Sequence, residues 1–312
     1  MERLENKLVE SIVDLIPSET LHMLAPIDSK WGRIASKRLN SFICARVVFV
    51  IHGQKLRIQA ARCSVLTGET KPWMDLASFN EDDVAMTTVN SITISGNFTD
   101  PPSVNVCPFT VDRNLGDSTF RAALLKFLGE VRISTNAELR LEDVHQDVGK
   151  LLAEAVRPGF QKVFVRKTNF DLNVFFEKHL KSNHLATVMI SHSQSHSYLP
   201  LFLKFRQKKL NYIVFEETSI DVRFIREILT WWNNADQVPF PLRVKFVSQD
   251  VYRLQQFFQS NPSAKRYYHQ PAEGVSYVLE HSVEQKRGRP YFTIVNVRRL
   301  ELEMKLTFVP GL

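Results

Sequence analysis

Apolar residues recur at steps of three and four positions through the first part of the chain. Between residues 4 and 16 this spacing describes an amphipathic helix, which Pro17 ends. Ser18 is a suitable N-cap for a second short helix, and a third contains Trp31. We therefore expect three short helices over residues 1–45, which have little interior to bury by themselves.

The rest of the chain alternates short β-branched runs with helical runs. The runs expected to form strands are Ser91–Ser95, Ala137–Leu141, Gln161–Arg166, Ala186–Ser191, Asn211–Glu216 and Arg243–Ser248. The runs expected to form helices are Leu124–Leu128, Val144–Val156, Leu172–Leu180, Leu199–Phe205, Val222–Trp232 and Val251–Phe258. This alternation predicts an α/β region over residues 46–312, with strand-helix-strand crossovers and a parallel sheet.

The middle strands also show a rough period. Leu139, Val163, Val188 and Ile213 are 24, 25 and 25 residues apart. Such a spacing lies within the range of leucine-rich repeats, although the asparagine ladder and the regular leucines of that repeat are missing. The pattern favours an irregular, leucine-rich-repeat-like array of strand and helix units, and a doubly wound sheet is the alternative.

The pattern changes again near the C-terminus. Strand-like runs at Val275–Leu279, Tyr291–Val297 and Leu302–Phe308 are joined by short connections without helical character. We expect an antiparallel meander over residues 270–312. It would cover the last exposed edge of the preceding sheet.

Composition narrows the function classes only slightly. The chain has 312 residues with 44% hydrophobic residues, enough for a packed core. Its net charge of +7 would suit an acidic partner, but 33 acidic residues are mixed among the 40 basic ones. The three cysteines form no CxxC pair, which fits a reducing compartment, so we expect the cytoplasm or the nucleus. Arg46 interrupts the longest apolar run, Ile43–Ile51, and we expect no membrane span.

The common catalytic signatures are absent from the sequence. It contains no GxxxxGK[ST] loop, GxGxxG turn, HExxH helix or GxSxG elbow, so we expect no enzyme activity and no cofactor. One group of histidines includes an H-x3-H pair: His179, His184, His192 and His196. Because cysteines and carboxylates do not accompany them, we interpret them as part of a polar loop and expect no metal site.

The N-terminal segment resembles an F-box. The resemblance is carried by residues 4–16, by Leu21 and Leu24, and by the sequence Ser-Lys-Trp-Gly-Arg-Ile-Ala at residues 29–35. In that family an aliphatic ladder follows an early Leu-Pro, and a basic-Trp pair closes the motif. Glu5 stands where the family usually has proline. The layout of an F-box followed by Phe-rich strand and helix units is similar to the large nematode F-box families, including those with an F-box-associated FTH region.

The resemblance implies a substrate-recruiting adaptor subunit of a Cullin-RING ubiquitin ligase. The N-terminal helices would bind a Skp-type adaptor, the α/β region would hold a protein target, and catalysis would belong to partner proteins. The alternative from another class is a basic RNA-binding or scaffold protein that begins with a helical cap. A continuous positive face would favour that alternative.

Two sets of site residues follow from these expectations. The apolar contacts with the adaptor are assigned to Leu8, Ile12, Leu21 and Trp31. Side chains alternate between the two faces of a strand. We expect one alternating set to face the helices, and the other set must then lie on the opposite face. The set expected to face the helices is Val163, Val165, Val188, Ile190, Ile213 and Phe215. The opposite face is assigned to target binding and consists of Phe164, Arg166, Met189, Ser191, Val214 and Glu216. In a doubly wound sheet helices would cover it.

Overall fold

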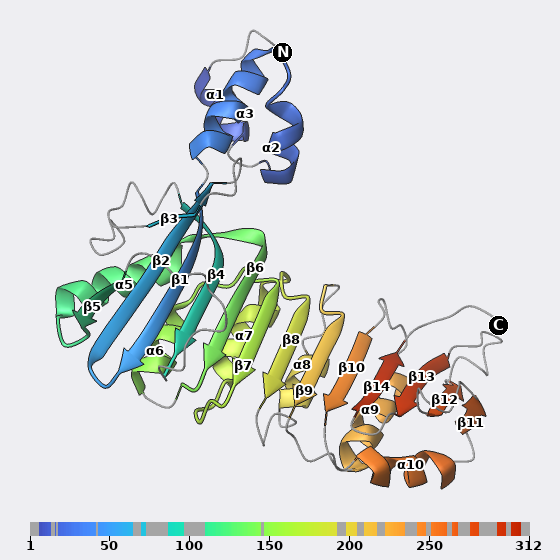
Figure 1. Ribbon diagram of the computed structural model, residues 1–312. Coiled ribbons are helices and arrows are strands. Elements are labelled where there is room, and N and C mark those ends of the chain that lie inside the picture. Colours follow the sequence, from blue (N-terminus) through green and yellow to red (C-terminus); the bar gives the residue numbers. More distant parts are fainter. Residues whose placement is uncertain are drawn as a thin grey trace. The chain divides into compact units, whose positions relative to one another are not determined.

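We describe a computed structural model of the chain (Figure 1). The described residues are 6–13, 16, 18–41, 43–64, 70–72, 87–96, 110–144, 147–191, 198–204, 209–216, 222–234, 242–247, 251–260, 264–267, 275–280, 292–297 and 301–306. The expected α/β class is confirmed, and the strands pair in both parallel and antiparallel directions. The chain divides into two compact units, residues 1–160 and 161–312. The boundary expected at residue 45 therefore falls inside the first unit.

Three short helices begin the first unit. They are α1 (Asn6–Val13), α2 (Ser18–Leu24) and α3 (Lys30–Ser41). Their buried side chains form one cluster, made by Val9, Val13, Leu21 and Ala35. Further apolar side chains pack against this cluster and are partly buried: Ile16, Leu24, Ala25, Trp31 and Ile34. The apolar spacing that predicted the helices thus produces a small core shared among them.

The first unit continues with a mixed sheet. Its strands are β1 (Ile43–His52), β2 (Lys55–Ser64), β3 (Thr70–Pro72), β4 (Thr87–Ser95), β5 (Thr110–Asn114) and β6 (Arg132–Glu142). The order is β6-β4-β1-β2-β3, and β5 also pairs with β2. The β6, β4 and β1 strands are parallel, whereas β2 runs antiparallel to β1, β3 and β5.

Two helices complete this unit, α5 (Ser118–Glu130) and α6 (Asp147–Ala155). The side chain of Asp117 caps α5, because its Oδ1 accepts hydrogen bonds from the N–H groups of Thr119 at 2.9 Å and Phe120 at 3.2 Å. Gly149 of α6 lies close to Ile51 of β1. The face of β1 that carries Ile51 is therefore the one that α6 covers.

The first sheet is held at its β2–β5 pair by an exposed ion pair. Arg57 Nε lies 2.8 Å from Asp112 Oδ1, and Arg57 Nη2 lies 3.2 Å from Asp112 Oδ2. The hydrogen bonds from Arg57 lower the pKa of the Asp112 carboxyl below its usual value. These residues are register partners, so the ion pair reinforces the backbone ladder between the two strands.

The second unit alternates strands and helices along the chain. The strands are β7 (Lys162–Arg166), β8 (Thr187–Ser191), β9 (Tyr212–Glu216) and β10 (Leu242–Val247), and the helices are α7 (Asn173–Lys181), α8 (Leu199–Lys204), α9 (Val222–Asn234) and α10 (Val251–Ser260). The four strands are parallel and neighbour one another in chain order. In a doubly wound sheet the strand order reverses at one point. The strands from β7 to β10 show no such reversal.

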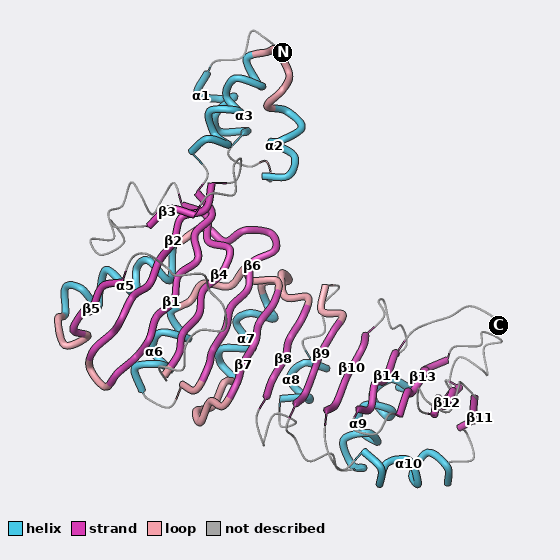
Figure 2. The backbone as a smooth tube through the Cα atoms, in the orientation of Figure 1, coloured by secondary structure: helices cyan, strands magenta, loops and turns pink. Residues whose placement is uncertain are grey.

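An aromatic chain packs the helices of this unit onto its strands. Phe176 of α7 lies 5.2 Å from Tyr198 and 5.0 Å from Phe202 between ring centroids, both edge-on. Phe202 of α8 in turn lies 6.4 Å from Phe215 of β9. The helix-covered face of the strands is therefore the one that carries Phe215, and α7 and α8 lie behind β7, β8 and β9 in Figure 2.

The predicted antiparallel meander is present at the C-terminus. Its strands are β11 (Ala264–Tyr267), β12 (Val275–Glu280), β13 (Phe292–Val297) and β14 (Glu301–Leu306). Successive strands pair antiparallel, and β14 pairs antiparallel with β10. The meander therefore continues the sheet from the last parallel strand. Among the residues that the structure describes, no helix has the length and apolar character needed to span a membrane.

Candidate protein-interaction surfaces

The helical segment places the four residues assigned to adaptor binding in different environments. Leu8 is 48% exposed, whereas Ile12 is half-buried. Trp31 is partly buried against the shared core. Leu21 is fully buried within that core, so any contribution that it makes to adaptor binding is through the packing of the helices. Helical periodicity assigns Leu21 to the apolar side of α2, and this side packs against the other two helices.

Two exposed apolar side chains of this segment were missed in the sequence. Met23 is 76% exposed and Ile27 is 51% exposed. Neither follows the spacing that marks the buried side of a helix, so periodicity gave no reason to select them. Together with Leu8 they form an exposed apolar set on and after α1 and α2. Exposed apolar groups mark interaction sites where they form one contiguous patch.

A close backbone approach fixes the start of α3. Ser29 accepts a hydrogen bond at its Oγ from the N–H of Gly32 at 3.1 Å, which caps the helix. A Cβ atom at Gly32 would overlap the carbonyl oxygen of Ile27. The sequence around Trp31 thus holds the turn after α2 tightly against α3, and this turn carries the exposed Ile27.

The second candidate surface is the face of β7, β8, β9 and β10 opposite to Phe215, which we call the outer strand face. The six residues expected to face the helices are all buried: Val163, Val165, Val188, Ile190, Ile213 and Phe215. The parallel register aligns the alternating residues in rows across the strands. The first row is Lys162, Thr187, Tyr212 and Arg243, the second is Phe164, Met189, Val214 and Lys245, and the third begins with Arg166, Ser191 and Glu216.

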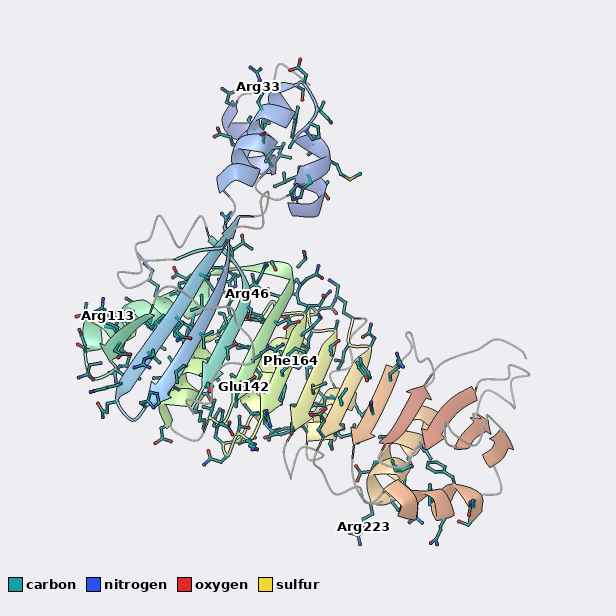
Figure 3. All side chains as sticks on the ribbon, viewed as in Figure 1. Arg33, Arg46, Arg113, Glu142, Phe164 and Arg223 are labelled. Carbon is teal, nitrogen blue, oxygen red and sulfur yellow. The ribbon has the colours of Figure 1, made fainter. Side chains whose placement is uncertain are left out.

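The residues assigned to target binding all lie on the outer strand face but differ in exposure. Arg166 is exposed, and Phe164 (labelled in Figure 3), Met189 and Glu216 are half-buried. Two assignments need correction, because Ser191 is only 5% and Val214 only 2% exposed. Each is a short side chain whose row neighbours are longer: Arg166 and Glu216 beside Ser191, and Met189 and Lys245 beside Val214.

Five further residues of this face were not selected from the sequence, one of which is Thr187 of β8. The other four are Lys162, Tyr212, Arg243 and Lys245. The guanidinium carbon of Arg243 lies 5.4 Å from the ring centroid of Tyr212, a cation–π arrangement between neighbouring strands. Period two together with the parallel register would have found them, since Arg243 and Lys245 alternate with the buried Val244 on β10.

Of the histidines considered as metal ligands, His179 is buried in α7 and packs against Phe175, with ring centroids 4.4 Å apart. Burial lowers the pKa of His179 to about 3, with a smaller contribution from Lys178. His184 is exposed, and His192 and His196 lie outside the described residues. In the described part of the chain, no group of three or more His, Cys, Asp or Glu side chains is arranged to hold a metal ion.

Comparisons with protein-family models, with curated proteins and with solved structures find no match to this chain.

Proposed function

We propose that the protein is a substrate-recruiting, F-box-type adaptor subunit of a Cullin-RING ubiquitin ligase. In this role the helices α1–α3 bind a Skp-type adaptor, and the leucine-rich-repeat-like strand and helix units of the second unit hold a protein target. The protein itself has no catalytic step, and it acts in the cytoplasm or the nucleus.

The observation that carries the proposal is the apolar surface of the helical segment. Five large hydrophobic side chains are markedly exposed among the described residues, and three of them lie on this segment: Leu8, Met23 and Ile27. The segment is only about forty residues long and already has its own core of Val9, Val13, Leu21 and Ala35. A small helical module that keeps apolar side chains outside its core is suited to docking against another protein.

The architecture of the second unit supports the target-binding part. Parallel strands that follow one another in chain order leave a face of alternating side chains, as in repeat proteins that bind partners along their strands. Arg166 is exposed there, and Phe164 and Met189 are half-buried. A face that mixes apolar and charged side chains provides both contact area and specificity.

The experiment is a binding measurement between the full chain and a purified Skp-type adaptor. Leu8→Asp and Met23→Asp place a charge on the exposed apolar surface, where burial against a partner would then be costly. We expect each variant to weaken adaptor binding by about tenfold or more, because interfaces concentrate their energy in a few apolar anchors. Ile12→Asp should act in the same direction.

The matched control is Val174→Asp, since Val174 is also a large exposed apolar residue but lies on α7 in the second unit. It should bind the adaptor as tightly as the unaltered chain. Thermal unfolding of each variant shows whether the helices remain folded. Adaptor binding that is the same in Leu8→Asp, Met23→Asp and Val174→Asp would refute the proposed docking surface.

A further inference from the structure

The outer strand face has an unequal distribution of charge. Between β7 and β10 its described side chains include four cations, Lys162, Arg166, Arg243 and Lys245, and one carboxylate, Glu216. On its other edge β10 pairs antiparallel with β14. On β7, Lys162 has Thr187 and Arg166 has Ser191 as its register partner on β8.

A single strand supplies the main recognition pattern. On β7 the half-buried Phe164 stands between Lys162 and Arg166 on the same face, because side chains two positions apart share a face. The separation of such neighbours is roughly 7 Å along the strand. Met189 of β8, which is also half-buried, continues the apolar row of Phe164, whereas Val214 of β9 lies in the same row but is buried. The face thus presents an apolar row bordered by cations.

We infer that this face binds an extended acidic segment of a target protein, with an apolar side chain placed between its carboxylates. The apolar side chain lies on the row of Phe164 and Met189, and the carboxylates meet Lys162 and Arg166 on either side. An extended chain repeats its side chains with the same period as β7, so the spacing of the two partners matches. This inference rests on the proposed function, since it names the chemistry of the target.

The same observations favour a peptide over a nucleic acid. Base stacking needs an accessible aromatic ring face, and the guanidinium of Arg243 already lies 5.4 Å from the ring centroid of Tyr212. The apolar row continues through a thioether and an aliphatic side chain, Met189 and Val214, which offer no flat ring. Glu216 also lies on this face and would repel phosphates.

The test is selection of peptides from a phage-displayed library of random short sequences on the immobilised full chain. We expect the selected peptides to be rich in Asp and Glu around a Leu, Met or Phe. Their affinity, measured by fluorescence anisotropy, should fall about tenfold or more in Lys162→Glu/Arg166→Glu, because like charges then face each other. Arg166→Glu alone, at an exposed position, should give a smaller loss in the same direction.

The matched control is Lys150→Glu/Arg121→Glu, which reverses two exposed cations on the helices α6 and α5 of the first unit. It should leave peptide affinity unchanged. Selected peptides that are neutral or basic, the absence of any selection, or equal affinity for both double variants would overturn the inference. Tighter binding of a uridine oligonucleotide, lost in Lys162→Glu/Arg166→Glu, would overturn it in favour of nucleic acid.

The two proposals fail in different measurements. Charge reversal on β7 should not change binding of the Skp-type adaptor, and Leu8→Asp should not change peptide binding. If the peptides behave as expected while the adaptor does not bind, the target chemistry stands and the ligase assignment falls.

Discussion

The hydroxyl of Tyr198 accepts a hydrogen bond from the backbone N–H of Leu172, with the two atoms 3.3 Å apart. Leu172 is the residue before the first turn of α7, and Tyr198 immediately precedes α8. Both residues are buried, and burial raises the pKa of the Tyr198 phenol. The backbone N–H groups at the start of a helix have no acceptor within the helix. Here the Tyr198 hydroxyl, which lies just before α8, supplies the acceptor for the N–H group of Leu172 at the start of α7.

We predict that Tyr198→Phe lowers the free energy of unfolding by about 1–3 kcal/mol, because it leaves the buried N–H of Leu172 without its acceptor while keeping the ring. Urea denaturation measures this difference. Tyr212→Phe removes a hydroxyl from a half-buried ring of the outer strand face, and it should change stability by less than about 0.5 kcal/mol. Equal effects of the two substitutions would contradict the assigned role of the Tyr198 hydroxyl.

Two helical glycines of the first unit should respond in opposite directions to the same substitution. A Cβ at Gly149 of α6 would overlap Val144 Cγ1, whereas the nearest heavy atom to a Cβ at Gly129 of α5 is 3.9 Å away. We expect Gly149→Ala to cost about 1–3 kcal/mol through overpacking. Gly129→Ala should instead stabilise the protein by about 0.5–1 kcal/mol through higher helix propensity.

Thermal and urea unfolding of both glycine variants provide the measurement. Stabilisation by Gly149→Ala would mean that the side chain of Val144 does not lie as close to α6 as the structure has it.

Burial of His179 should make the stability of the second unit depend on pH. The pKa of His179 is about 3 in the folded chain, below its ordinary value of 6.5. Between these values the unfolded chain binds a proton that the folded chain does not, so the stabilising contribution is complete above pH 6.5 and is lost as the pH falls. From pH 6.5 to pH 5 the loss should be about 2 kcal/mol.

The variant His179→Phe keeps an aromatic side chain next to Phe175 and removes the titrating group. Unfolding free energies at several pH values should fall less steeply for this variant than for the unaltered chain. His184→Asn is the control, because His184 is exposed, and its pH dependence should match that of the unaltered chain. Parallel curves for all three proteins would show that His179 does not set the slope.

The strands and helices of the second unit could be predicted because their two periods are distinct. Val163 and Val165 alternate with half-buried or exposed neighbours on β7, while the aromatic residues of α7 recur at helical spacing.

The hairpin of β1 and β2 was missed. Residues on both faces of β1 are buried, for example Phe49 and Val50, so the strand lacks alternation and resembles any short apolar run. The turn at Gly53, with φ of 57°, was the available signal.

The exposure of individual site residues could not be predicted in the same way. Phe164 and Val214 share one row of the outer strand face, yet Phe164 is half-buried and Val214 is buried between longer neighbours. Periodicity assigns a residue to a face, whereas exposure depends on the sizes of side chains on adjacent strands. The same reasoning explains the burial of Leu21. It lies on the apolar side of α2, and this side packs against the other two helices.

The contrast between Leu21 and Leu8 yields a prediction that separates folding from docking. Leu21 is fully buried in the shared core of α1–α3, whereas about half of Leu8 is exposed, 48% by area. Leu21→Ala removes buried atoms and should destabilise the helical segment by about 2–5 kcal/mol. Since a segment of this size has little stability to lose, adaptor binding should fall together with helix content.

Leu8→Ala should instead leave helix content and thermal unfolding nearly unchanged, because its side chain contributes little to the core. It should still weaken binding to the Skp-type adaptor, because the proposed contact is made by the exposed part of the side chain. In the full chain, the circular dichroism signal of α1–α3 cannot be separated from the signal of the other helices. The folding of α1–α3 is therefore measured by limited proteolysis of the full chain. Proteolysis at α1–α3 that increases equally in both variants would contradict the assignment of Leu8 to the docking surface, because it would make Leu8 a core residue like Leu21.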